Sequence, residues 1–65
     1  MSEGERTGVL VLRVWIERDA GNGLRARITA ERELGSGERT SVAAVTIEQI
    51  LAYIRTWVEE FVAAD

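Results

Sequence analysis

The side chains that could do chemistry are few in this 65-residue chain, because it contains no histidine and no cysteine. Their absence removes thiolate nucleophiles, disulfides and the usual zinc, iron and copper sites. Glu31 and Glu33 are spaced as two carboxylates on one strand face, but arginines surround them and no nucleophile accompanies them. Thr40 and Ser41 have no histidine that would activate a hydroxyl. We therefore expect a protein that is not an enzyme and that carries no metal or cofactor.

Two short glycine motifs, at residues 21–23 and 35–37, are the next candidates. A phosphate-binding loop needs a longer glycine spacing followed directly by a helix, and neither motif has it. Glycine, asparagine and serine are typical of tight turns. We interpret both motifs as connections between strands.

Three arginines near a tryptophan form the remaining group with chemical potential. Arg13, Arg25 and Arg27 could contact phosphates while Trp15 stacks on a base, which predicts a weak polar binding face. The same residues also have a structural use, because Arg25 can pair with Glu17 and Arg27 can lie on the Trp15 ring. The net charge of −3 disfavours general affinity for nucleic acid. Nucleic-acid binding is therefore the alternative and not the expected function.

Size and composition favour self-association. A domain of about 60 residues buries only ~60% of the surface of its unfolded chain, so its core is marginal without a cross-link, a metal or a partner. No disulfide is possible here, and we expect a homodimer or a higher homo-oligomer. No apolar run reaches the ~18–20 residues of a membrane span, and residues 1–8 lack the features of a signal peptide. We expect a cytoplasmic protein without membrane contact; its basic residues are all arginine, a composition that suggests a bacterial source.

The chain is organised as one α+β domain over residues 9–65, preceded by a flexible tail over residues 1–8. Residues 9–18 are rich in aliphatic and β-branched residues, continuous at first and then alternating with polar ones, and residues 24–34 alternate throughout. With a shorter run over residues 38–44, they predict three strands. Residues 46–63 repeat apolar side chains at helical spacing. The order predicts a three-stranded antiparallel β-meander followed by one amphipathic helix packed on one sheet face, a β-β-β-α two-layer sandwich.

The hairpin registers follow from pairing opposite charges. A first hairpin centred on Gly21 places Glu17 opposite Arg25, and a second centred on Ser36 places Glu33 opposite Arg39. Both registers leave one face apolar. That inner face comprises Leu10, Leu12, Val14, Ile16, Leu24, Ala26, Ile28, Ala30, Val42 and Ala44.

The predicted helix begins with a capping box formed by Thr46 and Gln49. At about 100° per residue, its apolar side chains span roughly 180°, more than one sheet needs to cover. We expect the flank with Ile50, Tyr53 and Trp57 to remain uncovered by a single sheet and to contact a second copy; the alternative is that these side chains are half-buried within one chain.

These features predict a homo-oligomeric protein-interaction module. The candidate interface residues share exposed apolar character on the first strand or the helix flank and are Val9, Val11, Trp15, Ile50, Tyr53, Trp57 and Phe61. The first strand is also a long, apolar, unprotected sheet edge that could pair with a second copy. A further alternative is a small-molecule pocket near Trp57.

The layout is similar to that of single-stranded-DNA-binding coactivator domains and of the MbtH-like partners of peptide synthetases. The chain lacks the lysine-rich strands of the first family and, having no proline, the signatures of the second. The sequence identifies no family.

Overall fold

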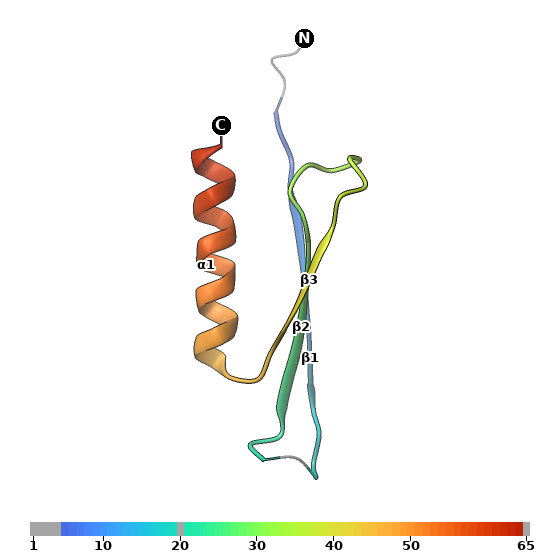
Figure 1. The fold of residues 1–65 in the computed structure, drawn as a ribbon, viewed down its shortest axis with the longest axis vertical. Helices are drawn as coiled ribbons and strands as arrows, with labels where there is room; N and C mark the ends of the chain where they lie inside the picture. Colours follow the sequence, from blue (N-terminus) through green and yellow to red (C-terminus); the bar gives the residue numbers. More distant parts are fainter. Residues whose placement is uncertain (1–4, 20, 65) are drawn as a thin grey trace.

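The computed structural model describes residues 5–19 and 21–64 and has the predicted β-β-β-α architecture (Figure 1). The strands are β1 (Val9–Ile16), β2 (Leu24–Glu31) and β3 (Thr40–Ala44), and the helix is α1 (Ile47–Ala63). They form one antiparallel sheet in the order β1-β2-β3, with α1 lying against one face. The predicted fold class is confirmed, and β1 and β3 are the edges of the sheet.

Both predicted hairpin registers are wrong by two residues. Trp15 lies opposite Arg25, whereas a hairpin centred on Gly21 would place it opposite Arg27. Ile28 lies opposite Val42, whereas a hairpin centred on Ser36 would place it opposite Ala44. In the first hairpin the Glu17 N–H donates to the Gly23 carbonyl at 2.7 Å. Glu17 is therefore opposite Gly23 and not opposite Arg25. A shift of two residues preserves which side chains share a face. The expected inner and outer faces are therefore correct even though the partners differ.

The connection between β2 and β3 is longer than expected, because residues 32–39 leave the sheet. The Glu31 carboxylate accepts the N–H groups of Gly35 at 3.0 Å and Gly37 at 3.4 Å. Both glycines have positive φ, at 92° and 84°, a conformation that other residues rarely adopt. The loop is thus fixed by a side chain of β2, and its geometry sets the register of β3.

The helix begins as predicted and is tied to the preceding loop. Thr46 is the N-cap and accepts the N–H of Gln49 at 3.0 Å. The Gln49 side chain accepts the N–H of Val45 at 2.8 Å, one residue before the expected position. The Asn22 amide donates to the Val45 carbonyl at 2.9 Å, which holds the start of α1 against the first hairpin.

The core is small and lies between α1 and the middle of the sheet. Among the described residues, the buried apolar side chains are Ala26, Ile28, Ala30, Ala44 and Ile50. Three of these five are alanines, so little apolar area is removed from water. The core of a single chain therefore provides only marginal stability.

The segment before β1 packs on the end of α1. The Thr7 carbonyl accepts the N–H of Leu34 at 2.8 Å. A Cβ placed on Gly8 would lie 2.8 Å from Phe61 Cε1 and 2.9 Å from Trp57 Cη2, so the rings pass directly over this glycine. The first part of the expected tail, residues 1–4, lies outside the described residues.

Candidate functional site

Exposed aliphatic side chains gather on the inner face of β1 and on one flank of α1. We call seven of them, which are between 40% and 65% exposed, the apolar trough: Leu12, Val14 and Ile16 on β1, and Ile47, Leu51, Val58 and Val62 on α1. The β1 residues lie on the inner face, because Leu12 and Val14 are opposite the buried Ile28 and Ala26. They belong to the face that carries α1, yet α1 does not cover them.

The position of α1 explains why the trough is open. The helix comes closest to β3, where Tyr53 Oη lies 3.4 Å from Thr40 Oγ1. Arg32, after β2, pairs with Glu60 at 2.7 Å on the same side of the helix. These contacts hold one flank of α1 on the β3 side. The opposite flank therefore faces β1, and its four trough residues fall within roughly 60° of one another at about 100° per residue.

The exposure of the inner face of β1 increases along the strand. Leu10 is half-buried against the core, and the exposed fraction then rises from 40% at Leu12 to 50% at Val14 and 58% at Ile16. Gly8, just before Leu10, lies under the aromatic rings at the end of α1. The helix thus approaches the start of β1 and is farther from its end.

The helix flank exposed to solvent differs from the expected one. Ile50 is buried, and Tyr53, Trp57 and Phe61 are half-buried. The Trp57 and Phe61 rings stack with centroids 5.6 Å apart, and the Arg6 guanidinium lies 4.0 Å above the Phe61 ring and donates to the Phe61 carbonyl. Because both flanks are apolar, periodicity alone could not show which would face the sheet.

The outer face of the sheet carries the predicted polar residues. Arg25 pairs with Glu17 at 3.4 Å, as expected. The cation on the Trp15 ring is Arg13, 4.7 Å from the ring centroid, and not Arg27 as the expected register implied. Arg27 donates instead to Ser41 Oγ at 3.0 Å.

Arg13 and Arg27 lie directly opposite each other on β1 and β2. Like charges in that position are destabilising, by roughly 0.2–1 kcal/mol. This juxtaposition arises from the observed register and could not be read from the sequence. The neighbouring apolar residues Val9 and Val11 are exposed on the same face.

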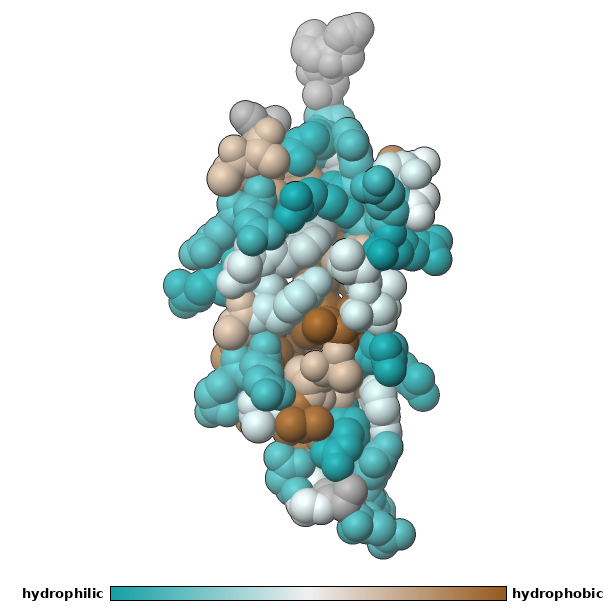
Figure 2. All heavy atoms as spheres, in the orientation of Figure 1, coloured by the Kyte–Doolittle hydropathy of each residue, from teal (hydrophilic) through white to brown (hydrophobic). Residues whose placement is uncertain are grey.

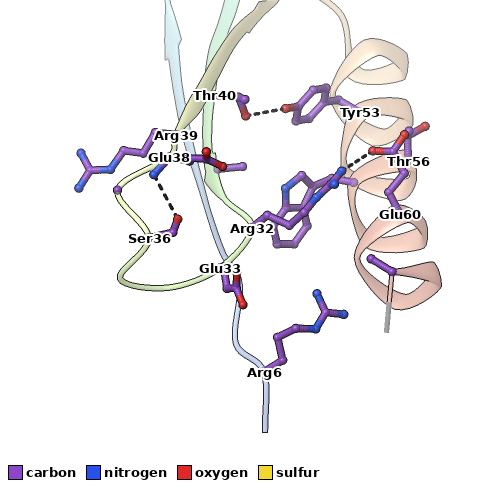
Figure 3. Close-up of a pocket in the computed structure, with 14 residues that line it drawn as sticks. Arg6, Arg32, Glu33, Ser36, Glu38, Arg39, Thr40, Tyr53, Thr56 and Glu60 are labelled. Atoms are coloured by element: carbon purple, nitrogen blue, oxygen red, sulfur yellow. Dashed lines mark hydrogen bonds and ion pairs between the residues drawn. The ribbon is translucent and has the colours of Figure 1, made fainter.

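A wide cleft lies between the second hairpin and α1 (Figure 3). Its volume is about 1000 Å³, and Tyr53 and Trp57 line it together with charged residues of both signs. Arg32 and Glu60 both line the cleft and form an ion pair with each other. The cleft lies near Trp57, where a small-molecule pocket was the further alternative, and its mixed charges define no particular ligand.

A space-filling view shows how hydrophobic and hydrophilic side chains are distributed on one side of the molecule (Figure 2). On the face shown in Figure 2, apolar side chains gather along the middle of the molecule and hydrophilic ones border them on both sides. Within the described residues, no helix is long and apolar enough to cross a membrane, and no acidic cluster is placed to hold a metal ion.

Comparisons with protein-family models, with curated proteins and with solved structures gave no match.

Proposed function

We propose that this chain is a small, non-catalytic protein-interaction module that acts as a homodimer, with the apolar trough as its dimer interface. The observation that carries the proposal is the trough itself. Single exposed aliphatic residues are ordinary on a protein surface, but seven of them gathered between one strand and one helix mark a contact surface.

The magnitudes support a dimer of moderate affinity. Burying one Val, Leu or Ile side chain fully contributes about 1.5–3 kcal/mol, so seven residues that are half-exposed offer on the order of 7 kcal/mol per chain. Two chains together offer about 14 kcal/mol, against the ~4–15 kcal/mol that association costs. The largest surplus in this range, about 10 kcal/mol, corresponds to a Kd of tens of nanomolar, and smaller surpluses give weaker dimers. Such a dimer dissociates on dilution.

The test compares two adjacent helix positions with the same change of charge. Leu51→Glu places a carboxylate in the trough, whereas Ala52→Glu places it on the exposed polar side of α1. We expect the solution mass of the wild type, measured by light scattering in a dilution series, to approach twice the chain mass of 7.2 kDa. Leu51→Glu should be monomeric and Ala52→Glu should behave as the wild type.

Two results would contradict the homodimer. The first is a solution mass of one chain for the wild type even at millimolar concentration, because such a chain does not self-associate. A Leu51→Glu variant that dimerises as well as Ala52→Glu would place the interface elsewhere.

A second candidate function, nucleic-acid binding by the outer face, is favoured by the opposed pair Arg13 and Arg27. An anion between the two guanidinium groups would relieve their repulsion. The measurement is fluorescence anisotropy of a labelled single-stranded oligonucleotide. Phosphate contacts predict binding that weakens steeply as salt rises and that Arg13→Gln reduces; equal anisotropy with and without protein at low salt would exclude this function.

A further inference from the structure

We propose that the two copies of this homodimer pair antiparallel through their β1 edges, with Leu12 opposite the partner's Leu12, to form one six-stranded sheet. This inference rests on the proposed homodimer and deepens it by specifying how the second copy is bound. It follows from three features of β1: its free backbone groups, its charges and its graded exposure.

The backbone of β1 restricts the pairing. The hydrogen bond from the Glu17 N–H to the Gly23 carbonyl shows that odd-numbered residues of this strand direct their backbone groups toward β2. Because these groups alternate along an antiparallel strand, Leu10, Leu12, Val14 and Ile16 direct theirs toward the free edge. A second copy can hydrogen-bond there only if even-numbered residues lie opposite even-numbered ones. The same condition places the two troughs on one side of the joint sheet.

Charge then distinguishes the three registers that are centred near the middle of β1. Of the symmetric arrangements that meet this condition, one centred on Arg13 sets the two Arg13 side chains opposite each other. One centred on Val11 sets Glu17 opposite the partner's Glu5. Like charges in these positions are unfavourable. Centring on Leu12 avoids both, because Arg13 then lies opposite the partner's Val11 and Glu17 opposite the partner's Thr7.

The register centred on Leu12 also uses the exposed apolar residues of the outer face. It places Val9 opposite the partner's Trp15, an aromatic and β-branched pair of the kind that stabilises neighbouring strands. The stem of Arg13 covers the partner's Val11. The apolar residues of β1 on both faces of the sheet thereby gain cross-strand contacts with the partner.

The graded exposure of β1 is complementary to itself under this symmetry. Ile16, the most exposed of the three β1 trough residues, comes opposite the partner's Gly8, and Val14 comes opposite the partner's Leu10. The start of β1 and the end of α1 lie at the same end of the molecule (Figure 1). The partner's helix therefore lies nearest the seam where this chain's helix is farthest from it. The exposed end of β1 in each chain is therefore covered by the end of the partner's helix.

The size of the contact is adequate for a dimer. A stable interface buries about 800 Å² on each partner. Half of seven aliphatic side chains together with an eight-residue strand edge offer an area of that order. The helix side that faces away from the sheet carries Glu48, Arg55 and Glu59, so a second sheet stacked on the helices is disfavoured.

Because the chain has no cysteine, single-cysteine variants can report the register directly. Opposite residues of a hydrogen-bonded antiparallel pair have Cα atoms about 5.5 Å apart, within disulfide reach. Leu12→Cys should therefore form a covalent dimer on oxidation. In the same register, a cysteine at position 11 or 13 lies two positions along the strand from its own copy. Their Cα atoms are then roughly 8 Å apart, beyond the ~7 Å limit for a disulfide. We expect Leu12→Cys to cross-link at least about tenfold faster than either neighbouring variant, because only the pair at position 12 lies within this distance limit.

A mixture provides the second readout and does not depend on position 12. Leu10→Cys mixed with Val14→Cys should cross-link faster than either variant alone, since these residues lie opposite each other across the seam. Fastest cross-linking of Arg13→Cys or Val11→Cys would overturn the register. Rapid cross-linking of Leu51→Cys with no preference on β1 would show a dimer joined by its helices, which refutes the edge pairing and leaves the proposed function intact. A monomer at all concentrations would refute both.

Discussion

Replacing Gly8 with alanine tests how closely the segment before β1 packs against α1. The added methyl group would lie 2.8 Å from Phe61 Cε1, 2.9 Å from Trp57 Cη2 and 3.0 Å from the Arg32 carbonyl oxygen. All three distances are shorter than ordinary van der Waals contact, and one of the neighbours is backbone. The aromatic rings must move if the chain is to keep its fold.

The expected loss of stability follows from two opposing terms. Forcing an extra methyl group into a packed site typically costs about 1–3 kcal/mol. A glycine-to-alanine change in a compatible conformation stabilises by ~0.4–1 kcal/mol, through the unfolded chain. The net effect is a destabilisation of about 1–2 kcal/mol, and at roughly 4–8 °C per kcal/mol for a domain of this size the Tm should fall by about 4–16 °C.

Thermal unfolding by circular dichroism at one fixed protein concentration measures this change. Phe61→Leu supplies the control, because the smaller side chain relieves part of the clash. In that background Gly8→Ala should cost less, with a coupling of about 0.5 kcal/mol or more. A Tm that rises in Gly8→Ala would refute the reasoning, since it would mean that the segment before β1 does not pack under the rings.

Three further predictions concern the core, the helix cap and a surface ion pair. Ile28→Ala should destabilise by about 2–5 kcal/mol, because Ile28 is fully buried; Leu34→Ala, at an exposed loop position, is the matched control and should change urea unfolding little. Thr46→Ala removes the N-cap hydrogen bond and should cost about 1 kcal/mol, seen as reduced helical ellipticity and a lower Tm. Arg32→Gln breaks the pair with Glu60 but should cost less than about 1 kcal/mol, because both side chains are exposed; a larger loss in chemical denaturation would show that this pair positions the helix.

The sequence predicted the elements and their faces because both depend on local periodicity. The apolar and polar alternation of residues 24–31 indicates which side chains of the sheet lie inside, and a register error of two residues leaves that pattern unchanged. The Thr46 cap was likewise predictable, because the hydroxyl and the N–H that it accepts are three residues apart. The candidate surfaces could be named only as sets of residues on these faces.

Tertiary structure decided the registers and the rotation of the helix. The registers depend on loop hydrogen bonds, such as those of Glu31 with two loop glycines, whose geometry has no periodic signal. The rotation of α1 depends on contacts with distant segments, including Tyr53 with Thr40 and the rings over Gly8. An apolar stripe of roughly 180° permits either flank to face the sheet. The sequence therefore determined that an apolar surplus would exist, and only the packing of distant segments determined that it would lie between β1 and α1.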